Sequence, residues 1–299
     1  MHDLVLYCKS YRNDFLRLKR LLASIDRFNA DGLPFYISTP IADHELLIQI
    51  VGQEGYHWVA DEEIVRANAQ ADFAAYQAMP GGLSQQIIKS EFWRLGLTEN
   101  YLCLDSDSLF IRPFYRPDFM AVDGNPYTVL HQNKEFLQLA TDRGHLRVER
   151  DLRVEAERVK ALFARVGPNF YCAPAPFIWS AKVWQSLDQG YLQPNDISLW
   201  KLISPAHPET LIYAEALLKY RAIPLIAIEP LFRTYHFDWH YYLMKRLGET
   251  EEKLRQNYLG VIYQSAWEFE LNLGQLQKST ASRLIKHLKR FCRYLQSFI

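Results

Sequence analysis

Short apolar runs alternate with helical patterns along the N-terminal part of the chain, and this alternation is what most constrains the fold. Residues 4–8, 34–39 and 56–59 are apolar runs typical of buried strands. A helical pattern follows the polar turn at 9–14, and another follows Asp43, a plausible N-cap. Strands that alternate with helices lie mostly parallel. We therefore expect an α/β fold with a mostly parallel central sheet flanked by helices.

A pair of acids follows the next predicted strand. Pro80-Gly81-Gly82 breaks the chain before a helix that runs to about Leu97, and residues 101–104 form a short apolar strand that ends in Asp105-Ser106-Asp107. Open α/β sheets bind ligands at the carboxyl ends of their strands. Two carboxylates at this spacing can share Mg²⁺ or Mn²⁺, which completes its shell with phosphate oxygens and water. The alternative is a turn in which side chains of this segment accept backbone N–H bonds.

The charge balance and the cysteines limit the class of protein. Lys plus Arg and Asp plus Glu are both 34, so no global field favours nucleic acid as a partner. The four cysteines show no CxxC or Cys/His ligand spacing, and two of them lie inside predicted strands. We therefore expect free cysteines in a reducing compartment. We find no signal peptide and no apolar run of the ~18 residues that a membrane span needs. The sequence predicts a cytoplasmic protein that is not integral to a membrane.

The last residues of the chain differ from the rest. From Lys278 onward the chain has no acidic residue, and residues 280–299 place apolar side chains on one helical face and basic ones on the other. This pattern predicts a helix on an anionic membrane surface, peripherally associated with the inner face of the cytoplasmic membrane. The alternative is a terminal helix that packs on the domain and exposes its basic face.

Two segments carry a resemblance to a known family. The runs GLSQQIIKSEFWRL at 82–95 and YLCLDSDSLF at 101–110 resemble glycosyltransferases of the GT-A fold, and more narrowly are similar to bacterial DUF6492-type proteins. The resemblance covers roughly residues 1–240. It implies a GT-A-like, Rossmann-like domain, with a DxD motif at Asp105 and Asp107.

The resemblance also implies a division of the chain. The GT-A-like domain spans 1–245, with a nucleotide-binding half at about 1–112 and an acceptor half at about 113–245. Residues 246–299 are then a C-terminal helical extension that carries the basic amphipathic tail.

The same resemblance implies roles for individual residues. Asp105 and Asp107 hold Mn²⁺ or Mg²⁺, and His236 is a further metal ligand, although His240 lies close enough in sequence to take its place. The other implied donor contacts come from the first strand and its turn, from the helix before the acids and from the acidic segment itself. They are Tyr7, Cys8, Tyr11, Arg12, Asp14, Lys89, Trp93, Asp105 and Ser106.

A catalytic base has to come from another loop, because the metal neutralises its own acids. Glu209 opens a predicted helix, and Glu209 and Tyr213 keep the spacing of a Glu and Tyr found in the related bacterial proteins. Glu215 and Asp238 are the reserve candidates. The alternative for Glu209 is an acid placed in the first helical turn by the helix macrodipole.

Together these features predict a metal-dependent glycosyltransferase. The donor is a nucleotide-diphosphate sugar, with a UDP-sugar favoured, and the acceptor is a glycan or lipid-linked glycan of cell-envelope polysaccharide or lipopolysaccharide synthesis. One alternative is an inactive nucleotide-sugar-binding protein. Another is a HAD-like phosphotransferase with Asp105 as nucleophile, although in that fold the acids follow the first strand. The donor sugar, the stereochemistry and the acceptor stay open.

Overall fold

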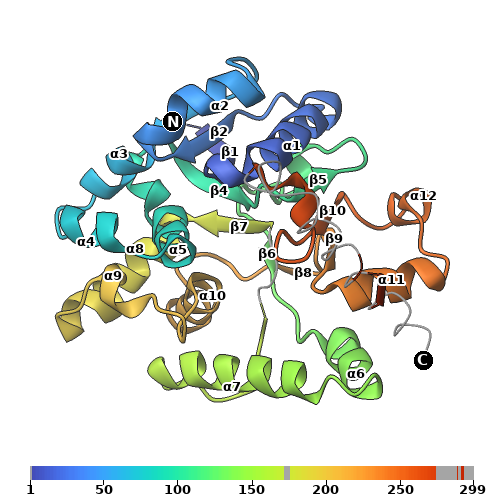
Figure 1. The fold of residues 1–299 in the computed structure, drawn as a ribbon. Helices are drawn as coiled ribbons and strands as arrows, with labels where there is room; N and C mark the ends of the chain where they lie inside the picture. Colours follow the sequence, from blue (N-terminus) through green and yellow to red (C-terminus); the bar gives the residue numbers. More distant parts are fainter. Residues whose placement is uncertain (1, 172–175, 274–287, 289–290, 293–299) are drawn as a thin grey trace.

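A five-stranded sheet forms the centre of the molecule (Figure 1). The computed structural model describes residues 2–171, 176–273, 288 and 291–292. The order of the central sheet is β3-β2-β1-β4-β7, and β7 alone runs antiparallel to its neighbour. The fold is therefore α/β with a mixed sheet, of which the first four strands are parallel as expected. These strands are β1 (His2–Lys9), β2 (Phe35–Thr39), β3 (His57–Ala60), β4 (Thr98–Leu104) and β7 (Phe177–Ser180).

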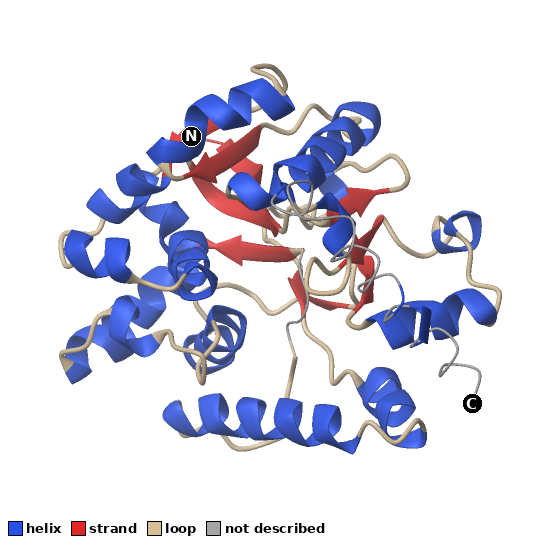
Figure 2. Ribbon diagram, in the orientation of Figure 1, coloured by secondary structure: helices blue, strands red, loops and turns tan. Residues whose placement is uncertain are grey.

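The parallel strands are apolar because helices cover both faces of the sheet (Figure 2). Residues 4–8 of β1 are buried, and helix α1 (Phe15–Phe28) buries Phe15, Leu18 and Leu21 in the same core. This α1 crossover joins β1 to its parallel neighbour β2. The carboxyl ends of β1 and β4 then lie side by side, since Cys8 pairs with Leu104.

A second sheet lies beside the acidic segment. Its order is β5-β10-β9, with β10 antiparallel to β5 and parallel to β9. Gly260 opens β10 where only glycine fits, because a Cβ there would meet the Phe232 ring and lie 2.6 Å from the Leu109 carbonyl oxygen. The strands are β5 (Ser108–Phe110), β9 (Phe232–Tyr235) and β10 (Gly260–Tyr263); β6 (Thr128–Val129) and β8 (Ala227–Ile228) form a separate parallel pair.

Strand β10 lies beyond residue 245, in the segment expected to be a helical extension. It pairs with β5 and β9 and completes the second sheet. Most of the amphipathic segment predicted at 280–299 lies outside the described residues.

The remaining helices surround the sheets (Figure 2). Within the part of the chain that the structure describes, no helix is long and apolar enough to cross a membrane. The helices are α2 (His44–Val51), α3 (Asp61–Arg66), α4 (Phe73–Ala78), α5 (Gly81–Glu91), α6 (Lys134–Asp142), α7 (Leu146–Leu162), α8 (Ala181–Leu187), α9 (Leu199–Leu202), α10 (Glu209–Tyr220), α11 (Asp238–Arg246) and α12 (Glu251–Leu254).

Candidate functional site

A polar cavity of about 250 Å³ lies at the carboxyl ends of β1, β4 and β10. This is the edge at which open α/β sheets bind ligands. Its walls come from seven separate segments: the end of β1, α1 with the turn before it, α5, the acidic segment, the start of β7, the start of α10, and β10 with the turn after it. The lining residues are Lys9, Asp14, Arg17, Gln85, Gln86, Lys89, Asp105, Ser106, Asp107, Phe177, Glu209, Thr210, Ile262, Gln264, Ser265 and Ala266. We call this the acidic cavity.

Asp107 has one satisfied and one unsatisfied carboxylate oxygen. Its Oδ2 accepts a hydrogen bond of 2.8 Å from the backbone N–H of Ser265. Its Oδ1 is buried and has no hydrogen-bond partner among the described residues. Burial, and then the charge of Asp105, raise the pKa of Asp107 to about 7. Burying a carboxylate oxygen without a hydrogen bond is costly, and a bound cation would offset that cost.

Asp105 is held by a buried lysine. Lys89 projects from α5, is 4% exposed, and forms an ion pair through Nζ with Asp105 Oδ1. Burial lowers the pKa of Lys89, but the charges of Asp105, Cys103 and Glu209 raise it by more, and the net shift is upward. Lys89 therefore stays protonated and supplies a fixed positive charge at the acidic segment.

The acidic turn itself is held mainly by backbone and hydroxyl groups. The Ser108 N–H donates to the backbone oxygen of Asp105 at 3.0 Å. Ser106 is buried, and its hydroxyl donates to Ser10 Oγ at 2.9 Å, which ties the end of β4 to the end of β1. Ser106 thus has a structural contact, and it lines the cavity together with Asp105 and Asp107.

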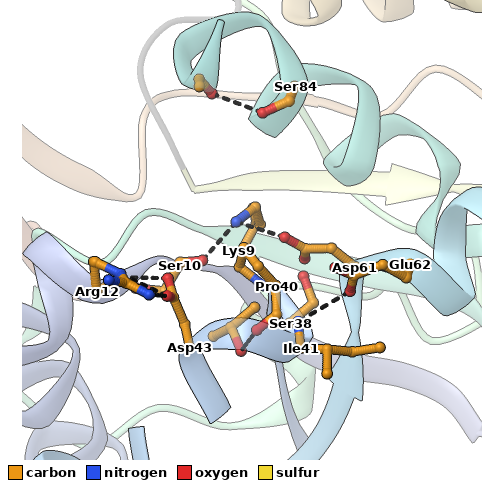
Figure 3. A network of polar contacts seen from close by, with 12 residues as sticks. Lys9, Ser10, Arg12, Ser38, Pro40, Ile41, Asp43, Asp61, Glu62 and Ser84 are labelled. Atoms are coloured by element: carbon orange, nitrogen blue, oxygen red, sulfur yellow. Dashed lines mark hydrogen bonds and ion pairs between the residues drawn. The ribbon is translucent and has the colours of Figure 1, made fainter. Parts of the chain in front are cut away.

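Two further cations line the acidic cavity. Lys9 ends β1, and its Nζ lies 2.8 Å from Asp61 Oδ2 and donates to the Ser10 carbonyl at 2.5 Å (Figure 3). Arg17 is 1% exposed and donates through one guanidinium nitrogen to Asp14 Oδ1 at 2.8 Å. Together with Lys89, these side chains give a cavity in which positive groups stand beside acids, a combination that suits phosphate bound with a metal ion.

Glu209 reaches the same cavity from the start of α10. It is 6% exposed. Burial raises its pKa to about 7, against the opposing effect of Lys89 and of backbone N–H groups at the helix start. The structure thus brings Glu209 to the same cavity as Asp105 and Asp107, as the sequence predicts.

Tyr7 and Cys8 are not among the described residues that line the acidic cavity. Both side chains are fully buried. The Tyr7 ring stacks on Phe92 with centroids 3.8 Å apart, and its hydroxyl hydrogen-bonds Ser38 Oγ at 2.8 Å. These residues belong to the hydrophobic core. Because they are consecutive in β1, their side chains point to opposite faces of the sheet, and both faces are packed.

The predicted residues of the turn after β1 differ in whether they line the acidic cavity. Arg12 binds Asp43, with its backbone N–H 2.9 Å from Oδ2 and its Nε 2.6 Å from Oδ1 (Figure 3). Tyr11 is 43% exposed. Neither residue is among the described lining of the acidic cavity, whereas Asp14 is.

Trp93 and the two reserve bases also lie away from this cavity. Trp93 belongs to a 3-10 helix, η3 (Phe92–Leu95), and is not part of the described lining. Glu215 forms a two-point ion pair with Arg165 at 2.5 and 2.7 Å. Asp238 accepts from the Trp239 N–H at 2.9 Å at the start of α11. The structure therefore does not bring these three residues together with Asp105 and Asp107 in the acidic cavity.

His236 lines a different cavity, next to His240, so the structure does not bring it to Asp105 and Asp107. His236 follows β9, whereas the neighbouring strand β10 reaches the acidic cavity. Gln264 follows the last residue of β10. In the described ranges there is no group of three or more His, Cys, Asp or Glu side chains that could hold a metal. The lining residues that could hold a metal ion include Asp105 and Asp107 as acids and Gln264 as a neutral oxygen donor.

Ten of the sixteen described lining residues were not among the predicted site residues, and four of these ten are Lys9, Arg17, Gln264 and Ser265. Lys9 had a usable signal, because it ends a buried strand at the ligand-binding edge. Gln264 and Ser265 follow the apolar run 260–263, which is a strand signal in a segment we expected to be helical.

Comparison with known families gives one match. A model described as a family of unknown function (DUF6492) matches residues 3–246. A search of curated proteins found no match. The matched region contains β1 to β9 and most of the acidic cavity, and it ends before β10. The chain belongs to the DUF6492 family.

Proposed function

We propose that this protein is a metal-dependent glycosyltransferase that uses a nucleotide-diphosphate sugar as donor. The observation that carries the proposal is the buried Oδ1 of Asp107, which has no hydrogen-bond partner among the described residues. Asp107 and Asp105 lie in a cavity that Lys9, Arg17 and Lys89 also line. Paired carboxylates suit a hard divalent cation, and the cations around them suit phosphate.

The donor set fits Mn²⁺ or Mg²⁺. Asp107 Oδ1 and the Asp105 carboxylate are the acidic ligands, and Gln264 can add a neutral oxygen from the turn after β10. Both metals accept few protein ligands when phosphate and water complete their shell. When bound, the ion would neutralise charge on the departing diphosphate.

The fixed cations hold the phosphates. Lys89 stays charged beside Asp105, and Arg17 is anchored by Asp14. Because these side chains are buried and already paired, they lose little conformational freedom when a ligand binds. They would orient the diphosphate in the cavity that Glu209 also lines.

Glu209 acts as the base. Its carboxylate lines the cavity and has a pKa of about 7, near the range in which a general base works best. It accepts the proton of the acceptor hydroxyl as that oxygen attacks the anomeric carbon. Lys89 stabilises the ionised form of Glu209 before the transfer.

The finer fold assignment is part of the same proposal. The order β3-β2-β1-β4 with acids directly after β4 agrees with the GT-A resemblance of the sequence. A HAD-like phosphotransferase needs a nucleophilic aspartate after the first strand, whereas β1 of this chain ends at Lys9 and Ser10 follows it.

We also propose that the C-terminal segment 280–299 binds anionic membrane, which would bring the enzyme to a lipid-linked glycan of the cell envelope. This part of the proposal rests on the basic, amphipathic sequence alone. Truncation after Ser279 should lower co-sedimentation with vesicles of anionic lipid and leave that with neutral vesicles unchanged. Equal co-sedimentation of both proteins with anionic vesicles would remove the membrane proposal.

A donor screen tests the function. Purified protein with Mn²⁺ is incubated with UDP-, GDP- and CMP-sugars, and the released nucleotide is measured. We expect release from at least one donor, with Asp107→Asn inactive and the exposed-site control Asp151→Asn unchanged. Binding of a nucleotide sugar without any release would favour the inactive binding protein.

A further inference from the structure

A second cavity, of about 880 Å³, lies beside the edge strand β9. Within the part of the chain that the structure describes, it shares no lining residue with the acidic cavity. Its walls come from the segment after β6, from α6, from β9 and from α11. Its volume is in the range of sites that enclose a small ligand. We call it the histidine cavity.

Two buried polar atoms of this cavity's lining are unsatisfied. Thr234 is 7% exposed and His240 is 3% exposed. Thr234 Oγ1 and His240 Nδ1 have no hydrogen-bond partner among the described residues. Buried polar groups are normally paired, and each unpaired one is costly. Both atoms belong to residues that line the same space, and hydroxyl groups are the kind of partner that both atoms lack.

The histidines are neutral at ordinary pH. Burial, and then the charge of His131, lower the pKa of His236 to about 4. Burial, and then Arg233, lower the pKa of His240 to about 3. A neutral imidazole has one donor and one acceptor nitrogen, and a hydroxyl group likewise donates and accepts. The pair therefore matches a polyol better than it matches an anion.

Charged residues of both signs line the histidine cavity, so they favour neither a cation nor an anion. Lys134 and Arg233 stand against Glu135 and Glu229 in the lining, and Arg233 is already bound to Glu249 at 3.1 Å. Phe136 adds an apolar surface: its ring centroid lies 4.3 Å from that of His236 and 5.2 Å from that of His240. A flat apolar surface beside neutral hydrogen-bonding groups suits a ligand with both C–H and hydroxyl faces.

We propose that the histidine cavity binds a neutral polyhydroxylated ligand, a carbohydrate. Thr234, His236 and His240 supply the hydrogen bonds, and Phe136 supplies the apolar surface. That this carbohydrate is the acceptor of a sugar transfer rests on the proposed function, whereas carbohydrate binding itself does not.

Saturation-transfer NMR on the full chain, without metal or nucleotide, tests this site. The probes are the methyl glycosides of glucose, galactose and mannose, with glucuronate as a charged comparison. We expect saturation transfer to at least one methyl glycoside and weaker transfer to glucuronate. Transfer to none of the methyl glycosides, or to glucuronate alone, would overturn the proposal.

Substitutions in the histidine cavity test whether the glycoside binds there. His236→Phe should weaken glycoside binding about tenfold, the loss expected for one buried hydrogen bond, while His236→Gln keeps a donor and an acceptor and should bind like the wild type. Thr234→Val is a second, nearly isosteric test at an independent position. Unchanged affinity in both His236→Phe and Thr234→Val would overturn the site.

One further variant separates the two proposals. Asp107→Asn removes a charge from the acidic cavity and should leave glycoside binding unchanged. Loss of glycoside binding in Asp107→Asn would place the carbohydrate in the acidic cavity and contradict the histidine cavity. A donor screen without activity, combined with glycoside binding that depends on His236, would sink the transferase proposal alone.

Discussion

Lys89 interacts with both Asp105 and Glu209 in the acidic cavity. It forms an ion pair with Asp105 and lowers the pKa of Glu209 through its charge. It comes from α5, sixteen positions before Asp105, and its placement depends on that helix packing over the end of β4. The sequence pointed to Lys89 through its position before the acids, but its contact with Asp105 follows only from the packed helix.

Replacing Lys89 by methionine tests this connection. Lys89→Met keeps the length of the side chain but leaves Asp105 and Glu209 without their cation, so we expect a loss of about 2 kcal/mol in the free energy of unfolding. Urea denaturation at neutral pH measures it. The matched control Lys182→Met breaks the exposed pair with Glu99 and should cost less than about 1 kcal/mol. Equal losses in both variants would contradict a special place for Lys89.

Asp107 predicts a pH dependence of stability in the metal-free protein. Its pKa rises from the ordinary 3.8 to about 7 on folding, so the folded state holds the proton more tightly than the unfolded state. The free energy of unfolding should therefore fall as pH rises from about 4 to about 7. Glu209 acts in the same direction.

Urea denaturation of the metal-free wild type and of Asp107→Asn across this range measures the effect. The variant should show a smaller fall, since its amide does not titrate. Added Mn²⁺ should restore stability to the wild type at the upper end of the range. A wild type whose stability rises with pH over this interval would show that the carboxylates are not desolvated as described.

At the scale of elements, strand β10 matters most. It places Gln264 and Ser265 at the acidic segment, and it does so because it pairs with β5 directly after the acids. The four strands β1 to β4 were predictable, since apolar runs alternate there with helical patterns. The pairing of β10 was not, because its partners lie far away in sequence and a four-residue run has no period that indicates a neighbour.

The direction of β7 shows the same limit. The apolar run at 177–179 predicts a strand, and the strand is present, but a short buried run has no sequence feature that distinguishes a parallel from an antiparallel partner. The sequence could not predict the burial of Tyr7 and Cys8, for a related reason. A strand buried on both faces does not show which end of it a ligand reaches.

Gly260→Val tests the role of β10. The valine side chain would meet the Phe232 ring and the Leu109 backbone, and backbone cannot move aside as a side chain can. We expect a loss of about 3 kcal/mol in the free energy of unfolding, measured by urea denaturation. Gly81→Ala is the control, because no atom lies within 4 Å of its added Cβ and alanine favours helix α5. A Gly260→Val protein as stable as the wild type would mean that β10 is not seated between β5 and β9.

At the scale of the whole molecule, two cavities with different chemistry lie in one α/β fold. The acidic cavity joins cations and carboxylates at the ends of β1, β4 and β10, while the histidine cavity is neutral and lies beside β9. The sequence predicted the first through Asp105 and Asp107. It assigned His236 to that same site, because the resemblance implied a late histidine, and only the packed structure separates them.

Calorimetric titration of UDP tests the central proposal, that Asp105 and Asp107 hold a metal that binds a nucleotide diphosphate. Wild type, Asp107→Asn and Asp151→Asn are each titrated with and without Mn²⁺. We expect wild type and Asp151→Asn to bind UDP only with Mn²⁺, and Asp107→Asn to bind about 100-fold more weakly, or roughly 3 kcal/mol. Equal binding by all three proteins, or binding that does not depend on Mn²⁺, would contradict the proposal.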